Sequence, residues 1–216
     1  NNAKFASKQK LDALGLTDHG TCSGLVEHWQ SCNEHNIKPI LGCEFYLRLP
    51  EPWVDVGPSR NSKSGRYHIT FLTTSFEGYK RLIKINNAAH LNIEESRGKK
   101  YPIVTFDMFE EFAGDGLIAL TGCVASVTFH DISSIADEYI NFLVKTFGRN
   151  NVYAEIMPHE ITRFDGQLLN GYERPLELSK RFGLKTVYTT DAHVSEEYQL
   201  NLLSKYTQAM KGYEFT

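Results

Sequence analysis

The sequence predicts an α/β fold built on a parallel sheet, either open or closed into a barrel. Strand-like and helix-like patterns alternate along almost all of its 216 residues, and repeated βα units with short links favour parallel strands. Two strand-like runs at opposite ends of the chain finish in an Asp and a His. A hydrophobic content of 41% is enough for one sizeable core. A single α/β domain with polar side chains at its strand ends is therefore expected.

Each element follows from local composition. Runs rich in Val, Ile, Leu, Tyr and Thr predict strands at 12–18, 38–47, 67–74, 116–122, 151–157 and 185–191. Helical patterns occupy 23–35, 76–92, 107–113, 132–147, 173–182 and 195–212. Gly148 and Gly183 are expected to end their helices, and Ser195 to begin the last one. Pro175 fits near a helix start, after a loop or turn at 165–172.

Composition and charge narrow the function classes. With 23 basic and 26 acidic residues, the net charge of −3 makes the whole domain a poor electrostatic surface for nucleic acid, so any such contact must be local. The longest apolar runs have the length of strands, which predicts no membrane-spanning helix. Because the sequence begins at Asn1, we expect it to be a fragment of a longer protein. An N-terminal targeting signal of that protein could then lie upstream of these residues.

The four cysteines show no C-x-x-C pair, which is typical of reduced thiols in a cytosolic protein. Cys22, Cys32 and Cys43 are expected to be buried structural residues. Cys123 differs, because it directly follows the apolar run 117–122 at a strand end. It is either structural or a ligand.

One segment, residues 50–66, has three prolines, two glycines and three basic residues, and no periodicity. Long irregular connections of this kind are often functional. The segment is either a solvent-exposed loop without a specific role or a loop whose Arg60, Lys63 and Arg66 contact phosphate groups. The basic run at 97–100 has the same two interpretations.

The strand ends supply the candidate metal ligands. His19 is the better candidate of the adjacent pair, and Asp18 would orient it or join the coordination. Asp191 and His193 are two residues apart and share a face, which suits joint ligation. Glu44 lies inside an apolar strand, where a carboxylate is costly to bury unless it is paired or bound to metal.

Other histidines are less clearly placed. His68 stands at the start of its strand, the wrong end for a rim of strand ends, and could equally be a core histidine. His159 follows the strand at 151–157 and could line the same rim. The remaining histidines are expected to be ordinary surface residues: His28, His35, His90 and His130.

The ligand types indicate the chemistry. Mixed His, Asp, Glu and Cys donors suit Zn²⁺, Mn²⁺ or Fe²⁺ better than an all-oxygen Mg²⁺ site. Clustered metals bridged by a carboxylate are suited to phosphoester hydrolysis. The sequence contains no G-x-S-x-G, no P-loop and no G-x-G-x-x-G motif. It therefore supports neither catalysis by a serine nucleophile nor nucleotide binding by a glycine-rich loop.

Six segments together carry a resemblance to a known family, in order across nearly the whole chain: Ala13–Gly20, Ile37–Tyr46, Tyr67–Leu72, Glu77–Leu82, Gly116–Cys123 and Val187–His193. The chain resembles the polymerase-and-histidinol-phosphatase (PHP) domain, in the version found in C-family bacterial-type replicative polymerases, the DNA polymerase III alpha subunits. The Glu-Gly-Tyr and Thr-Gly-Cys segments are characteristic of this polymerase branch.

The resemblance implies a distorted (β/α)7 TIM-like barrel with up to three metal ions, Zn²⁺ or Mn²⁺ or Fe²⁺, at its rim. Carried over by position, the implied ligands are His19, Glu44, His68, Cys123, Asp191 and His193. Glu44 would bridge two ions, and Glu44, Asp191 and His193 would be the catalytic residues. Residues 1–216 would form one PHP domain that lacks its first strand and the family's His-x-His motif, so fewer ions would bind here.

Three functions remain open. The resemblance implies a 3′–5′ exonuclease or phosphoesterase within a cytoplasmic replicative polymerase. Its partners would be a single-stranded DNA 3′ end, the remaining polymerase domains and other replisome subunits, with no membrane. The alternatives are a non-catalytic structural module of the polymerase and a free-standing phosphoesterase similar to histidinol phosphatase. The resemblance places the palm carboxylates of the polymerase outside residues 1–216, so we expect that these residues do not themselves extend DNA.

Overall fold

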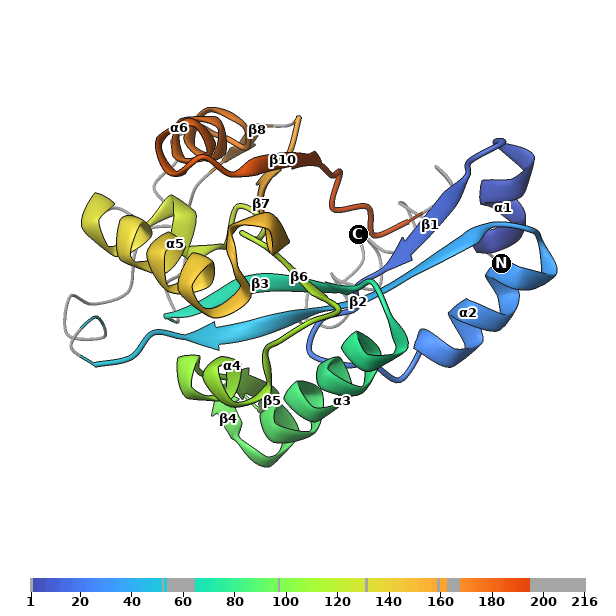
Figure 1. Ribbon diagram of the computed structural model, residues 1–216, viewed down its shortest axis with the longest axis horizontal. Coiled ribbons are helices and arrows are strands. Elements are labelled where there is room, and N and C mark those ends of the chain that lie inside the picture. The colour runs from blue at the N-terminus through green and yellow to red at the C-terminus, as the bar shows by residue number, and fades with distance from the viewer. Residues whose placement is uncertain are drawn as a thin grey trace, which may run out of the picture.

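The computed structural model contains a mixed eight-stranded sheet flanked by helices and a separate two-stranded hairpin (Figure 1). It describes residues 2–51, 53, 65–96, 98–130, 132–158, 160–162 and 168–194. The strands are β1 (Ala13–Leu16), β2 (Lys38–Arg48), β3 (Arg66–Thr73), β4 (Ile93–Ser96), β5 (Lys99–Val104), β6 (Leu117–Leu120), β7 (Val152–Ile156), β8 (Glu160–Thr162), β9 (Leu168–Asn170) and β10 (Lys185–Tyr188). The helices are α1 (Asn2–Lys8), α2 (Leu25–Glu34), α3 (Phe76–Leu91), α4 (Phe106–Phe112), α5 (Ser133–Phe147) and α6 (Glu173–Phe182).

The expected α/β class is confirmed, and all six predicted strands are present. Five predicted helices are present as well, while the sixth, at 195–212, lies outside the described residues. Gly148 and Gly183 end α5 and α6 with positive φ values of 79° and 63°, as expected. Pro175 is the third residue of α6, where its missing N–H costs no helical hydrogen bond. None of the described helices has the length and apolar character needed to cross a bilayer.

The expectation of a uniformly parallel sheet is wrong. The strand order is β10-β7-β6-β3-β2-β5-β4, with β1 also paired to β2. Strand β3 runs antiparallel to both β2 and β6, and β4 runs antiparallel to β5, whereas the other pairs are parallel. A parallel crossover usually needs a helix, and no helix was predicted between β2 and β3. Strand β3 instead pairs directly with β2 in the antiparallel direction.

This reversal decides where the site can form. In a parallel pair the carboxyl ends of the strands meet at one edge, but the start of an antiparallel strand lies at that same edge. The register pairs His68, near the start of β3, with Tyr46, near the end of β2. His68 therefore lies on the same rim as the ends of β1, β6 and β10.

Helices cover the sheet on several sides (Figure 1). Helix α2 packs on β2, α3 on β3 and β5, α5 on β6 and β7, and α6 on β7 and β10. Helix α5 buries residues four apart, such as Ile135 and Tyr139, so one apolar face meets the sheet. Aromatic rings fill the core between sheet and helices, where Phe71 lies 5.0 Å from Phe109 and 5.1 Å from Phe147 between ring centroids.

Three segments form structure that the sequence patterns did not predict, and the first is helix α1 at the start of the chain. Residues 98–100 of the predicted basic run belong to a hairpin, in which Gly98, with a φ of 73°, lies between β4 and β5, while Arg97 lies outside the described residues. The predicted loop at 165–172 contains the short strand β9, paired with β8. Within the irregular segment 50–66, residues 52 and 54–64 lie outside the described residues.

Gly122 lets the loop after β6 approach β3. Its φ of 95° lies in a region that side-chain-bearing residues rarely adopt. A Cβ atom at this position would stand 2.3 Å from the carbonyl oxygen of His68 and 2.9 Å from the Cβ of Ser126. The absence of a side chain here therefore brings the following residue, Cys123, against the start of β3.

We expect Gly122→Ala to destabilise the protein more than Gly148→Ala does. Gly148 has a similar φ of 79°, but a Cβ there would meet nothing within 4 Å. Both variants strain the backbone, and only the first adds a collision, which typically costs about 1–3 kcal/mol. Denaturant unfolding of the two variants measures the difference. Equal losses of unfolding free energy would show that the β6 loop does not depend on this close approach.

Candidate metal site

The carboxylate of Glu44 lies at the centre of the site. Glu44 is in the middle of β2 and is only 6% exposed. The parallel pairing of β1 with β2 continues beyond β1 as a single bridge between His19 and Glu44. The Glu44 N–H donates to the Asp18 carbonyl at 3.1 Å, and the Gly20 N–H donates to the Glu44 carbonyl at 2.7 Å. These two backbone bonds fix His19 beside Glu44.

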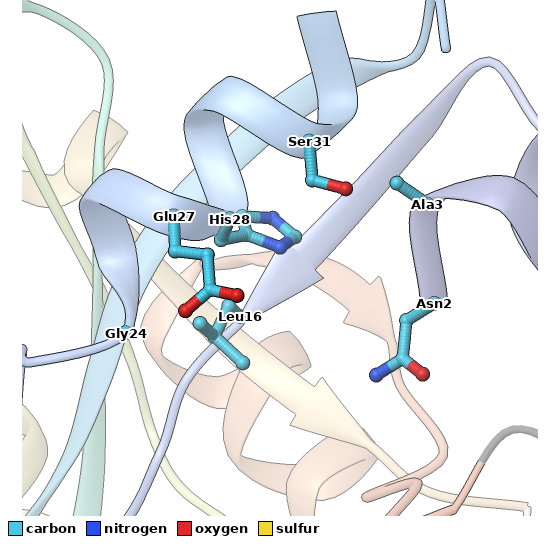
Figure 2. Close-up of a pocket in the computed structure, with 7 residues that line it drawn as sticks. All are labelled: Asn2, Ala3, Leu16, Gly24, Glu27, His28 and Ser31. Carbon is cyan, nitrogen blue, oxygen red and sulfur yellow. The ribbon is translucent and has the colours of Figure 1, made fainter. Parts of the chain in front are cut away.

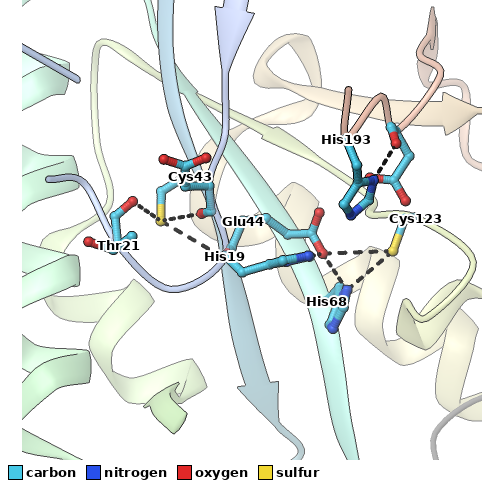
Figure 3. A network of polar contacts seen from close by, with 9 residues as sticks. His19, Thr21, Cys43, Glu44, His68, Cys123 and His193 are labelled. Carbon is cyan, nitrogen blue, oxygen red and sulfur yellow. Dashed lines mark hydrogen bonds and ion pairs between the residues drawn. The ribbon is translucent and has the colours of Figure 1, made fainter. Parts of the chain in front are cut away.

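Two imidazoles contact this carboxylate (Figure 3). The Nδ1 atom of His19 lies 3.4 Å from Glu44 Oε1, and Nδ1 of His68 contacts the same oxygen. One ligand atom from each of the three residues lies within 4.8 Å of the others. His68 is therefore part of the cluster and not an isolated core histidine, because β3 runs in the reverse direction.

The other implied ligands surround this group. The Cys123 thiol lies 3.8 Å from Glu44 Oε1 and 3.3 Å from His68 Nδ1. The rings of His193 and His19 have centroids 5.7 Å apart. An Asp191 carboxylate oxygen lies 3.8 Å from His193 Nδ1. Side chains from β2, β3 and the ends of β1, β6 and β10 thus meet at one rim.

A hydrogen bond to the backbone sets the tautomer of His193. Its Nδ1 atom lies 2.7 Å from the carbonyl oxygen of Asp191, which can only accept a hydrogen bond. Nδ1 therefore carries a hydrogen, and in the neutral ring Nε2 has the lone pair. The side chain is 51% exposed, so this lone pair can reach a cation or a ligand from solvent. Histidine ligands of metals commonly donate their second ring N–H in this way.

The electrostatics of the cluster favour a cation. Burial alone would raise the pKa of Glu44, but hydrogen bonds from His19 and His68 and their positive charge lower it to about 2. The hydrogen bond with Glu44 raises the pKa of His19 despite partial burial. Burial, and then the charge of Glu44, raises the pKa of the Cys123 thiol well above its usual value. The buried carboxylate stays charged and requires positive charge beside it.

The donor set fits a divalent metal. Imidazole nitrogens, carboxylate oxygens and a thiol from separate strands gather around one small volume. This combination suits Zn²⁺, Mn²⁺ or Fe²⁺. A cation would provide the compensation that imidazole protons otherwise supply, and it would also favour the thiolate of Cys123.

The remaining predicted site residues lie at its margin or beyond it. Asp18 is exposed, its backbone carbonyl holds Glu44, and its charge helps to raise the pKa of His19. Arg66 forms an ion pair with Glu94 and lies over the ring of Tyr101, 4.0 Å from its centroid. A phosphate would have to compete with Glu94 for this arginine. His159, Arg60 and Lys63 lie outside the described residues.

Sequence reasoning missed one buried acid near the site and misplaced one histidine. Glu155 on β7 is 5% exposed, and burial raises its pKa to about 7. The signal was available, because Glu155, like Glu44, is a carboxylate inside an apolar strand. His130, expected at the surface, is buried: its ring lies 5.8 Å from that of Tyr67, and its Nδ1 accepts a hydrogen bond from the Ile132 N–H.

A separate hollow of about 360 Å³ lies among α1, β1 and α2 (Figure 2). Leu16, Glu27 and His28 are among the residues that line it. The Nε2 atom of His28 contacts the carbonyl oxygen of Leu14 at 3.0 Å, so this ring supports β1. None of the lining residues belongs to the metal-ligand set, and we assign no chemistry to this hollow.

Comparisons with known proteins identify the family and agree with the fold. The family model for the PHP domain matches residues 1–159. The chain is 30% identical to DNA polymerase III subunit alpha of Thermus aquaticus over 185 residues, which are 84% of this chain and 14% of that protein. It is 28% identical to the same subunit of Chlamydia trachomatis, over 94% of this chain and 18% of that protein. The chain thus spans less than a fifth of these relatives' length.

A solved structure shares the fold. It is a protein from Bifidobacterium adolescentis assigned as a metal-dependent phosphoesterase, with a TM-score of 0.50 and 12% sequence identity. The match covers 89% of this chain and 81% of that one, and at this identity it establishes the fold alone. The family model covers more than half of the chain, so this chain belongs to the PHP domain family.

Proposed function

We propose that this chain is the PHP domain of a replicative DNA polymerase alpha subunit and that it hydrolyses single-stranded DNA from the 3′ end with divalent cations. The observation that carries the proposal is the buried carboxylate of Glu44 in contact with His19 and His68. Similarity to alpha subunits over 84% and 94% of the chain supports the polymerase context. The proposed partners are the remaining polymerase domains and other replisome subunits, in the cytoplasm.

His19, Glu44 and His68 are the proposed core of the metal site, because their ligand atoms are already within 4.8 Å of one another. Cys123, Asp191 and His193 complete the set. Glu44 is the proposed bridge between two ions, since both imidazoles contact the same carboxylate oxygen. The ions proposed are Zn²⁺ or Mn²⁺, or Fe²⁺, given the mixed nitrogen, oxygen and sulfur donors.

Divalent cations lower the pKa of a coordinated water and neutralise charge on a phosphodiester. Glu44 would hold the cations from the buried side of the site, where its charge is least screened by solvent. Asp191 and His193 would meet the scissile phosphate, because the exposed imidazole of His193 lies on the open side of the cluster. The phosphoesterase assignment of the Bifidobacterium protein supports this substrate class.

Hydrolysis of a single-stranded oligonucleotide labelled at its 5′ end tests the proposal on the intact protein. We expect 3′-end shortening with Mn²⁺ or Zn²⁺ that a chelator abolishes. Glu44→Gln should reduce the rate at least about 100-fold, since it removes a charged ligand and the proposed bridge. Glu110→Gln is the matched control, because Glu110 is an exposed residue on α4 that pairs with Lys145. Its rate should equal that of the wild type.

The alternatives predict other outcomes of the same experiment. Cleavage of a small chromogenic phosphodiester without cleavage of DNA would favour a free-standing phosphoesterase. A metal-loaded protein that cleaves neither substrate would favour a non-catalytic module. Equal rates for Glu44→Gln and Glu110→Gln would place the chemistry elsewhere in the protein.

Metal affinity should rise with pH across the range in which His19 loses its proton. Glu44 raises the pKa of His19 above its ordinary value, so a cation must displace this proton in acidic solution. For each proton displaced, affinity should increase about tenfold per pH unit and then level off above the pKa. Calorimetry of Mn²⁺ binding in two buffers of different ionisation enthalpy counts the protons. Binding at pH 6 without proton release would contradict this role of His19.

A further inference from the structure

Glu155 connects two loops that carry predicted metal ligands. Strand β7 lies between β6 and β10 in the sheet, and Glu155 is buried near its end. Its backbone N–H donates to the hydroxyl of Thr121 at 3.0 Å. Its carboxylate oxygen Oε1 accepts from the hydroxyl of Thr189 at 2.7 Å. One residue thus bonds to a threonine side chain on each neighbouring strand end.

Each threonine stands two residues before a predicted ligand. Thr121 precedes Cys123, and Thr189 precedes Asp191. Backbone bonds reinforce both contacts: the Thr121 N–H donates to the Tyr153 carbonyl, and the Thr189 N–H donates to the Ile156 carbonyl, each at 3.0 Å. Both ligand loops are therefore fastened to β7 by one backbone bond and one side-chain bond.

The loop after β10 needs such an attachment. Asp191 has a φ of 49°, which is uncommon for a residue other than glycine. Strained conformations persist only where surrounding contacts hold them. Among the described residues from Asp191 onward, the polar contacts of this loop are local ones between His193 and Asp191, and the ring of His193 also lies 5.7 Å from that of His19 between centroids. The Glu155–Thr189 bond is the nearest side-chain bond, among the described residues, that ties the loop to the rest of the sheet.

We propose that Glu155 is a positioning residue, and that the Thr121–Glu155–Thr189 bridge sets the separation of Cys123 from Asp191 and His193 so that they can share divalent cations. This inference rests on the metal site proposed above. Glu155 acts through the two threonines and does not itself contact the cation. Its role requires an oxygen acceptor at Oε1, not a negative charge, so glutamine can replace it.

Thr189→Val tests the bridge, because valine keeps the shape of threonine and removes only the hydroxyl donor. The matched control is Thr190→Val, at the exposed neighbouring position one residue closer to Asp191. Co²⁺ titration of the intact, metal-free protein, followed by visible absorption, measures affinity and ligand geometry together. We expect Thr189→Val to weaken Co²⁺ binding about 10- to 100-fold and to change the absorption bands. Thr190→Val should match the wild type.

Conservative variants separate positioning from general stability. Thr189→Ser keeps the hydroxyl and Glu155→Gln keeps an acceptor oxygen, so both variants should retain wild-type Co²⁺ affinity and spectra. Glu155→Leu removes the acceptor and should behave like Thr189→Val. Identical Co²⁺ affinity and spectra in Thr189→Val and Thr190→Val would overturn the inference. A wild-type protein that takes up no Co²⁺ would overturn it as well. Normal Co²⁺ binding without DNA cleavage would count against the proposed nuclease alone.

Discussion

The arrangement of side chains at the strand ends depends on one requirement, which is to compensate the buried negative charge of Glu44. A carboxylate placed inside an apolar strand loses several kcal/mol of hydration unless positive charge and hydrogen bonds replace it. Here the contacts with His19 and His68 lower the pKa of Glu44 to about 2, despite a burial that acts in the opposite direction. The same contact raises the pKa of His19. In the proposed metal site, protons and divalent cations would therefore compete, and the charge state of the site would depend on both pH and metal.

The direction of β3 makes this compensation feasible. If β3 ran parallel to β2, the start of the strand, and His68 with it, would lie at the opposite edge of the sheet from the end of β2. The antiparallel register instead sets His68 opposite Tyr46, two residues beyond Glu44. Gly122 then allows the β6 loop to approach the backbone of His68 closely enough for the Cys123 thiol to reach the cluster. Backbone topology thus determines the ligand geometry.

Much of this arrangement could be predicted from local sequence. Apolar runs gave the six strands, and an Asp or His at a strand end indicated His19, Asp191 and His193. The reversal of β3 was harder to foresee, since strand direction depends on pairing between distant segments. The absence of a helical pattern in the sequence between β2 and β3 was its one local signal. The β4–β5 hairpin was missed because β4 is short and acidic, and because β5 begins with two lysines and contains Pro102, which weakens any strand pattern. The bridge through Glu155 depends on three separate segments, which no local pattern can reveal.

Anomalous diffraction from crystals of the intact protein grown with Zn²⁺ would test the central claim most directly. We expect an anomalous peak in contact with a Glu44 carboxylate oxygen and with nitrogens of His19 and His68, at roughly 2.0–2.2 Å from each ligand atom. Further peaks should involve Cys123, Asp191 and His193. A zinc ion bound elsewhere, with Glu44 still paired only to the two imidazoles, would contradict the account.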